Sequence, residues 1–378
     1  MIGAAQAASR PSQGGFSETN LHVGAYSLCS RDETGVAVWR RIPAVVRAVL
    51  TGLAVMVAGQ FPWSILIVVN LRQPHSPPWA VPIMALYLTL YWRYLNGWGW
   101  PTRSAQMRRD SFRARGLPGN VWLRAMASGM LAVAAAVMLQ NAYGRLVPIP
   151  AAIAPDFSPY PWYTVLLPLL MGGTVSGVAE EAGFRGYMQS AIEREHGPVV
   201  AIAVVSLAFA AIHFTHGVSG TLPRLPYYLA ISVIYGMLTY RTGSILPALA
   251  IHAGGNALEY LIVWRWGIRH SAPLIWQSGP DVAFWRDLGL GLVLGMAAVW
   301  AYKSLRQVRS SIPAQPPEGS FGTLRPTSLP PPLETQSGQD AIFFPAATIA
   351  LEGALRKRAA LEAWPGGPAL CDPARTIT

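Results

Sequence analysis

Long runs of apolar residues, separated by short polar segments, fill most of the chain between residues 48 and 302. The first run, residues 48–71, has no charged residue over 24 positions, which is enough for a helix to cross about 30 Å of hydrocarbon. Seven further runs lie at 76–92, 125–144, 160–179, 198–216, 225–240, 244–264 and 288–302. This pattern predicts an all-α fold, a polytopic transmembrane helix bundle of about eight spans. Several runs are shorter than twenty residues, so the exact number of spans depends on them.

The composition agrees with a membrane protein. Hydrophobic residues make up 52% of the chain and charged residues only 12%, while the mean hydropathy is +0.31. Fourteen Trp and fourteen Tyr are typical of the aromatic belts at membrane interfaces. A net charge of +11 would suggest nucleic acid in a soluble protein, but here the bases lie between apolar runs. We therefore expect contact with anionic lipid and no nucleic-acid partner.

The placement of arginine predicts the topology. Seven arginines and a single acid, Asp110, lie in the loop from residue 93 to residue 124, so the positive-inside rule makes this loop cytoplasmic. With two spans before the loop and eight in total, both termini are expected in the cytoplasm, and Lys303 and Arg309 follow the last run. The basic residues in 265–286 fall on the predicted outer side, which is a modest inconsistency.

Two adjacent glutamates, Glu180 and Glu181, follow the run 160–179. Neighbouring helical residues project about 100° apart, so the two carboxylates need not have the same role. Glu181 and Arg185 are four positions apart and can pair on one face, which leaves Glu180 free. A carboxylate in a partly dry bundle is suited to act as a general base. The alternative interpretation is an ion pair at the membrane edge that merely ends the helix.

A histidine, His213, ends the apolar stretch that follows Gly197. It is either a satisfied core residue or a base. If the chain reverses at Gly197, Glu180 lies 17 residues before the turn and His213 lies 16 after it. At about 1.5 Å per helical residue, the two would lie at similar depth on adjacent antiparallel helices.

A second histidine, His252, shares a helix face with Asn256 four positions on. Gly254 and Gly255 between them would allow a backbone or a substrate to approach closely. A histidine and an amide on one face could donate hydrogen bonds to a developing oxyanion. Hydrogen bonding between helices is the alternative, because polar residues often have that role in membrane bundles.

Taken in order, the three clusters resemble the CPBP family, which comprises the type II CAAX prenyl endopeptidases and the bacterial bacteriocin-processing and immunity proteins. The motifs that carry the resemblance are Glu-Glu-x-x-x-Arg at Glu180, Glu181 and Arg185, Phe-x-x-x-His at Phe209 and His213, and His-x-x-x-Asn at His252 and Asn256. The resemblance covers about residues 160–265. It implies that Glu181 and Arg185 orient the site.

The same resemblance implies the catalytic roles. Glu180 and His213 would activate a water for attack on a peptide carbonyl, and His252 and Asn256 would stabilise the oxyanion. Family members have been described both as metalloenzymes and as metal-independent glutamate peptidases. Glu180, His213 and His252 could bind zinc with a water in the open position. No His-Glu-x-x-His helix is present, and an asparagine fits an oxyanion role better than ligation, so we expect no cofactor, with zinc as the open alternative.

A peptide or membrane-protein substrate is expected. The composition, rich in Ala, Arg, Gly and Pro, hints at a bacterial genome of high GC content and hence at a bacterial inner membrane, where prenylated CAAX proteins are not expected. Two other classes remain open: a non-catalytic membrane scaffold or bacteriocin-immunity protein of the same fold, and a transporter. A transporter would spread Glu and His over several spans, but the run 125–144 has neither.

The sequence thus divides into five predicted segments. These are a disordered cytoplasmic N-terminal tail (1–38), N-terminal transmembrane helices with the basic loop (39–158), a catalytic transmembrane core (159–265), a last transmembrane helix (266–303) and a Pro-rich disordered C-terminal tail (304–378).

Overall fold

A computed structural model of the chain describes residues 39, 41–73, 75–150, 156–267 and 273–309. All regular structure in these segments is helical, and they contain no strand, which confirms the predicted all-α fold. The last helix extends past residue 303 to Arg309. Residues 1–38 and 310–378 lie outside the described residues, so disorder of the two tails stays a prediction.

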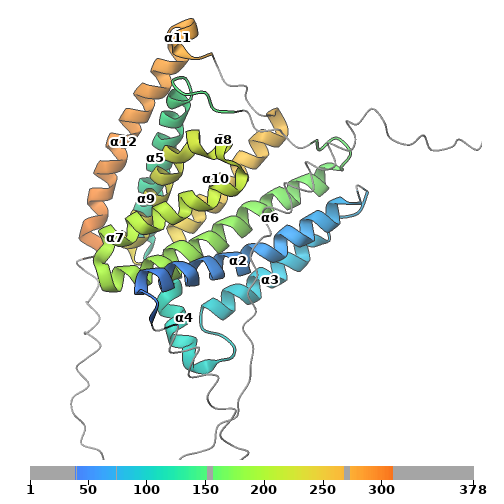
Figure 1. Cartoon of the computed structure of the whole chain (residues 1–378), viewed down its shortest axis with the longest axis vertical. Coiled ribbons are helices and arrows are strands. Elements are labelled where there is room, and N and C mark those ends of the chain that lie inside the picture. Colours follow the sequence, from blue (N-terminus) through green and yellow to red (C-terminus); the bar gives the residue numbers. More distant parts are fainter. Residues whose placement is uncertain (1–38, 40, 74, 151–155, 268–272, 310–378) are drawn as a thin grey trace, which may run out of the picture. The chain divides into compact units, whose positions relative to one another are not determined.

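Eight long helices occupy the described chain (Figure 1). They are α2 (Ala44–Leu71), α3 (Ala80–Leu95), α5 (Gly119–Tyr143), α6 (Trp162–Glu180), α7 (Gln189–Ile212), α9 (Leu225–Thr242), α10 (Leu246–Trp266) and α12 (Val282–Arg309). Each of the eight apolar runs overlaps one of these helices. The shorter elements are η1 (Thr102–Ser104), α4 (Ala105–Phe112), η2 (Glu181–Met188), η3 (His213–His216), α8 (Val218–Thr221), η4 (Leu222–Arg224) and α11 (Ile275–Ser278).

Five helical segments in the described chain are long and apolar enough to cross a membrane, judged by length and composition. They are Ala44–Leu71, Gly119–Tyr143, Trp162–Thr215, Leu246–Trp266 and Val282–Leu305, and the third contains both α6 and α7. The chain therefore has the helices of an integral membrane protein. The figure of eight spans stays a prediction, because α3 and α9 are not among these five segments and α6 and α7 fall in one of them.

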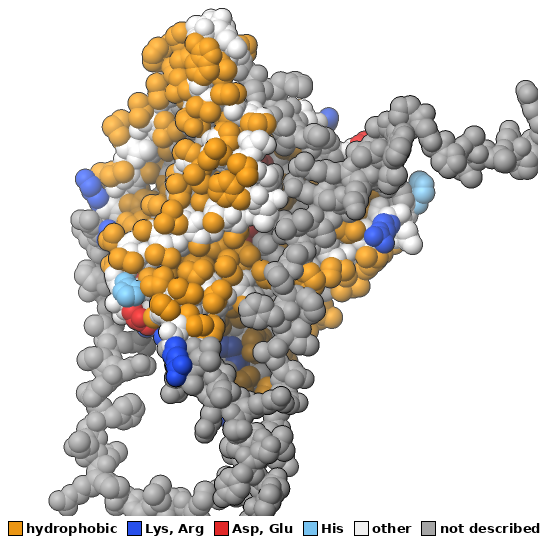
Figure 2. Space-filling view, viewed as in Figure 1, with side chains coloured by type: hydrophobic (Ala, Val, Ile, Leu, Met, Phe, Trp, Pro, Cys, Tyr) orange, Lys and Arg blue, Asp and Glu red, His pale blue; other side chains and the backbone are white. Residues whose placement is uncertain are grey.

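The outer surface of these helices is apolar. Figure 2 shows a face on which hydrophobic side chains cover most of the described surface. Large side chains such as Leu123, Leu207 and Met296 are 64–70% exposed. Such a surface suits contact with lipid chains rather than with water.

Close helix packing positions the candidate site within the compact unit Ala48–Thr378, which is distinct from the unit Met1–Arg47. The helix α10 packs along α6, α9 packs along α7, and α12 packs along α5. A Cβ atom added at Gly177 of α6 would lie 2.6 Å from the Cβ of Ala253 on α10. A Cβ atom added at Gly173 would lie 2.8 Å from the backbone nitrogen of Ala257. These small residues let the two backbones approach, as in the small-xxx-small interfaces of membrane helices.

The predicted chain reversal at Gly197 is present. Gly197 has φ 77° and ψ 172°, which interrupts α7, and Pro198 follows it. A positive φ of this kind is accessible to glycine without a Cβ clash. After the reversal, the ring of Phe209 packs edge-on against Phe184, with centroids 5.4 Å apart. The reversal therefore returns the second half of α7 to the segment that carries the glutamates.

One arginine of the basic loop is internal. Arg108 on α4 is only 4% exposed, and its guanidinium donates hydrogen bonds to four backbone carbonyl oxygens, those of Tyr94, Trp98, Gly99 and Pro101. It also lies over the ring of Tyr94, 4.3 Å from the centroid. Arg108 therefore organises the loop and is not a surface charge.

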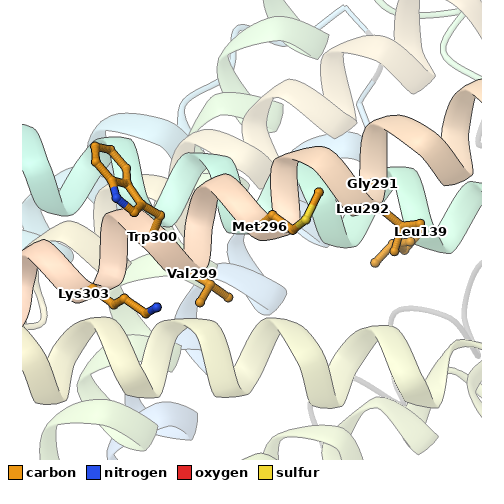
Figure 3. A pocket seen from close by; sticks show the side chains of 8 residues that line it. Leu139, Gly291, Leu292, Met296, Val299, Trp300 and Lys303 are labelled. Carbon is orange, nitrogen blue, oxygen red and sulfur yellow. The ribbon is translucent and has the colours of Figure 1, made fainter.

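An open groove of about 450 Å³ lies between α5 and α12 (Figure 3). Its lining is almost wholly apolar and includes Leu139, Met296, Val299 and Trp300, with Lys303 at one end. None of the candidate site residues lines this groove. We assign it no function, because an apolar groove on this surface would be filled by lipid chains.

Candidate active site

The candidate site lies where α2, the end of α6, η2 and α10 meet. The small-residue contacts between α6 and α10 place Glu180 and Glu181 opposite His252 and Asn256. On the other side, a Cβ atom added at Gly59 of α2 would lie 2.5 Å from the Cβ of Ala179, so α2 also approaches α6 closely.

Glu180 is held through one carboxylate oxygen. Its Oε1 accepts hydrogen bonds from the side-chain amide of Gln60 and from the hydroxyl of Ser176, each 2.7 Å long. Its Oε2 lies 3.7 Å from Nε2 of His252. Glu180 is 8% exposed, so this carboxylate is almost removed from solvent. The two bonds fix its orientation and leave Oε2 directed at the histidine.

Glu181 is fully buried, and one of its carboxylate oxygens contacts both Arg185 and His252. Its Oε1 lies 2.9 Å from Nη1 of Arg185 and 2.8 Å from Nδ1 of His252. This confirms the ion pair predicted from the spacing of Glu181 and Arg185. Arg185 is also fully buried, donates to the hydroxyl of Ser232 at 3.1 Å and lies 4.7 Å from the ring centroid of Phe209. A buried ion pair is costly to desolvate, so we infer that this pair holds the geometry of the site rather than adding stability.

His252 lies between both glutamates. Nδ1 of His252 donates to Glu181, which fixes the tautomer or the charged form and directs Nε2 towards Glu180. The imidazole also stacks on the ring of Tyr235, with centroids 5.0 Å apart and planes at 23°. The cluster of Glu180, Glu181, Arg185 and His252 thus brings two carboxylates, a guanidinium and an imidazole together in a buried place.

Asn256 is linked to Glu180 through a serine. Its Nδ2 donates to the hydroxyl oxygen of Ser176 at 3.0 Å, and the same hydroxyl donates to Glu180. An amide nitrogen has two N–H donors, and among the described residues only Ser176 accepts one of them. The second N–H of Asn256 can serve a bound group.

His213 joins the site through aromatic neighbours. Its ring stacks on Tyr228 at 3.9 Å between centroids, and the ring of Phe209 lies 4.8 Å from His213 and 6.2 Å from His252. Nδ1 of His213 lies 2.7 Å from the backbone carbonyl oxygen of Phe209, so Nδ1 carries a proton and donates it to that oxygen. Glu180, Glu181, Arg185, His252 and Asn256 thus form one contact network, and His213 adjoins it through Phe209.

The glutamate motif is not α-helical. Glu181–Met188 form a π-helix, whereas the interpretation of the sequence spacing assumes α-helical geometry. π-Helical turns occur frequently at functional sites. A Cβ atom added at Gly183 would lie 2.5 Å from the backbone oxygen of Gly52, and Gly186 lies close to the backbone of Phe112, so the wider segment fits because its glycines leave room for these neighbours. Glu181 and Arg185 still meet on one side.

Two contributors, Gln60 and Ser176, are not predicted from the sequence. Gln60 is a polar residue within the uncharged run 48–71, which is the signal that could have indicated it. Ser176 lies one helical turn before Glu180 and so shares its face. Neither belongs to the three motifs.

The residues proposed as alternative metal ligands do not form a metal centre here. Among the residues that the structure describes, no group of three or more His, Cys, Asp or Glu side chains is placed to hold a metal ion. The alternative ligand set of Glu180, His213 and His252 is therefore not assembled as a metal site in this conformation. Metal dependence itself stays a matter of proposal.

Comparison with known proteins gives one family. The sequence model of the family described as type II CAAX prenyl endopeptidase Rce1-like matches residues 161–258. No curated protein and no solved structure matches the chain. The matched segment contains all three motifs, all of α6, η2, α7 and α9, and the first part of α10. The match confirms that residues 161–258 are similar to the Rce1-like family, which is a family of endopeptidases.

Proposed function

We propose that the protein is an intramembrane endopeptidase that hydrolyses a peptide bond with a water activated by Glu180 and His213. The observation that carries the proposal is the position of His252, which contacts Glu181 at 2.8 Å and faces Glu180 at 3.7 Å in a nearly dry cluster. A general base and an electrostatic stabiliser are thereby placed side by side.

The attack begins at the second carboxylate oxygen of Glu180. Gln60 and Ser176 occupy Oε1, so Oε2 is the oxygen that accepts a proton from water. As the water oxygen bonds to the carbonyl carbon, its proton moves to Glu180 and the carbonyl oxygen becomes an oxyanion. Glu180 then returns the proton to the amide nitrogen as the carbon–nitrogen bond breaks. His213 assists by orienting the water through Nε2.

The oxyanion is stabilised by donors from one face of α10. In this proposal the Nε2–H of a protonated His252 is one donor, and the second N–H of Asn256 is the other. Removing one such donor typically lowers the rate by about 10²–10³-fold. Glu181 and Arg185 act as positioning residues, because Glu181 fixes the ring of His252 and Arg185 fixes Glu181.

We propose that the reaction needs no metal and that the substrate is a peptide or membrane protein that enters from the bilayer. The proposed location is a bacterial inner membrane rich in anionic lipid, with both termini in the cytoplasm. Two basic residues on the predicted outer side are paired with acids. Arg145 pairs with Asp281 at 2.8 Å and Arg286 with Asp287 at 2.7 Å, which offsets their charges.

The test uses the purified full chain in nanodiscs that contain anionic lipid. Wild type and Glu180→Gln are incubated with a library of membrane-inserting peptides and with a farnesylated peptide ending in a CAAX sequence, and products are identified by mass spectrometry. Cleavage by wild type that is lost in Glu180→Gln and survives a chelator supports the proposal. Cleavage lost with the chelator would point to a metalloenzyme. Equal cleavage by the two proteins would overturn the role of Glu180.

Absence of cleavage in every arm would favour the scaffold or immunity protein of the same fold. To separate that outcome from misfolding, both proteins are compared by circular dichroism and thermal unfolding. Glu180→Gln keeps the shape of the side chain, so we expect unfolding close to that of wild type.

A further inference from the structure

A third polar residue, Glu259, continues the functional face of α10. It follows Asn256 by three positions and His252 by seven, so at about 100° per residue it projects within about 20° of His252. Along the helix axis the seven residues correspond to about 10 Å. None of the three sequence motifs includes Glu259.

The surroundings of Glu259 connect it to the site. It is exposed, and no ion pair or hydrogen bond involves its carboxylate within the described part of the chain. It lies within electrostatic range of Arg224, Tyr227 and Tyr228. Tyr228 is the residue whose ring stacks on His213. The carboxylate is therefore within electrostatic range of the tyrosine that packs against His213.

Arg224 does not neutralise Glu259 by direct pairing. Its guanidinium donates to the backbone oxygen of Gly220 at 2.7 Å and to that of Pro150 at 3.1 Å. Arg224 still reduces the negative potential at Glu259, so the attraction for a cation will be moderate. An ionisable residue at membrane depth without a direct partner is a functional candidate, because burial in a bilayer is unfavourable for it otherwise.

We propose that Glu259 is a specificity subsite that binds a lysine or arginine side chain of the substrate. The inference rests on the proposed peptidase function. An extended peptide advances about 3.3 Å per residue, so a chain lying along α10 from the oxyanion site reaches Glu259 two or three residues from the cleaved bond. The ligand class is thus a peptide with a cationic side chain at that distance.

The experiment has a cleavage arm and a binding arm, both with the full chain in nanodiscs and the same peptide library. The cleavage arm compares wild type with Glu259→Gln and the charge-reversed Glu259→Lys. The binding arm measures which peptides are retained by Glu180→Gln and by Glu180→Gln combined with Glu259→Gln, so it needs no turnover. Glu195→Gln is the matched control, since it removes a carboxylate whose side chain is 52% exposed near the reversal at Gly197.

The expected result is enrichment of Lys or Arg two or three residues from the cleaved bond, about fivefold over a neutral residue, as for a partly screened charge pair. Glu259→Gln abolishes the enrichment, Glu259→Lys favours Asp or Glu there, and Glu195→Gln leaves it unchanged. Retained peptides without Lys or Arg enrichment overturn the subsite, whether or not cleavage occurs. If wild type cleaves peptides without preferring Lys or Arg, the subsite is wrong and the peptidase function stands. If the binding arm retains peptides enriched in Lys or Arg but no peptide is cleaved, the peptidase function is wrong and the subsite stands.

Discussion

The side-chain amide of Gln60 donates a 2.7 Å hydrogen bond to Oε1 of Glu180, although the two residues are 120 positions apart. Gln60 lies on α2, outside the segment 161–258 that matches the family. Together with Ser176, it occupies one carboxylate oxygen and leaves the other facing His252. The N-terminal half of the chain therefore contributes directly to the candidate site.

Replacing Gln60 with methionine should lower turnover. Methionine keeps the length of the side chain but donates no hydrogen bond, so Glu180 loses one of the two contacts that orient it. We expect kcat to fall about tenfold with KM little changed, since a contact that matters in the transition state is lost. The measurement is peptide cleavage at saturating and limiting substrate over a range of pH.

The variant Gln60→Glu tests whether Gln60 positions Glu180 or only fills the space beside it. The introduced carboxyl group can donate to Glu180 when it is protonated, whereas its ionised form repels Glu180. Activity should therefore recover towards acidic pH in this variant and not in Gln60→Met. Ser64→Ala is the matched control, because within the described segments the Ser64 hydroxyl has one hydrogen bond, to the backbone oxygen of Gln60 at 3.4 Å. If Gln60→Met keeps full kcat, or if Ser64→Ala loses as much, the positioning role of Gln60 is wrong.

Glu181 and Arg185 should behave as a coupled buried pair. Glu181→Gln leaves the guanidinium of Arg185 without its carboxylate, so we expect a loss of about 3–5 kcal/mol in the free energy of unfolding. Replacing both, with Glu181→Leu and Arg185→Met, removes both charges and should cost less than the sum of the two single changes. Thermal and denaturant unfolding in nanodiscs measures the coupling.

The double variant should nevertheless lack peptidase activity, because His252 loses the acceptor of its Nδ1 proton. Additive stability losses, or a double variant as active as wild type, would contradict the role given to this pair.

The sequence predicted the fold class and much of the site for physical reasons. A span needs an uninterrupted apolar run, so helices are visible without any structure, and the reversal at Gly197 follows from a glycine and a proline between two runs. The pair His252–Asn256 lies on one α-helix, where regular spacing decides which residues share a face. The pair Glu181–Arg185 also follows from spacing four apart, because the two side chains still meet in the π-helix.

Other features could not be predicted, because they depend on contacts between distant segments. The contact of Gln60 with Glu180 requires α2 to lie against α6, and no spacing within α2 reveals its partner. The π-helix at Glu181–Met188 depends on glycines that admit neighbouring backbones. The burial of Arg108 is similar: its charge fits the positive-inside pattern, but the carbonyl cage that holds it comes from loop geometry.

Asp281 should make the segment before α12 sensitive to acid. The backbone N–H of Phe284, and then the guanidinium of Arg145, hold the pKa of Asp281 below its ordinary value. A lowered pKa means that the ionised form stabilises the fold, so the contribution is present above the ordinary pKa of about 4 and is lost as pH falls below it. Hydrogen exchange at the start of α12 should therefore accelerate at low pH in wild type.

Asp281→Asn should exchange faster than wild type at neutral pH and equally fast at acidic pH, once intrinsic exchange rates are taken into account. Asp110→Asn is a suitable control, because the side-chain contacts of Asp110 within the described segments are with Gln106, at 2.9 Å, and Arg115, at 3.6 Å, and not with α12. Identical exchange of wild type and Asp281→Asn at neutral pH would show that the contacts of Asp281 do not hold the start of α12.

The approach of α6 to α10 should be essential for the site, and Gly177 tests it. The Cβ atom of Gly177→Ala would lie 2.6 Å from the Cβ of Ala253 and 2.8 Å from its backbone nitrogen, so the helices must separate. We expect a loss of about 1–3 kcal/mol in stability from overpacking, and a larger effect on turnover, because His252 and Asn256 move away from Glu180.

Gly254→Ala on α10 is the matched control, since nothing lies within 4 Å of its added Cβ. That change should be neutral or stabilising by up to about 1 kcal/mol, as expected for alanine in a helix. Unfolding and peptide cleavage are measured together, and equal effects of the two substitutions would show that close packing of these helices does not set the catalytic geometry.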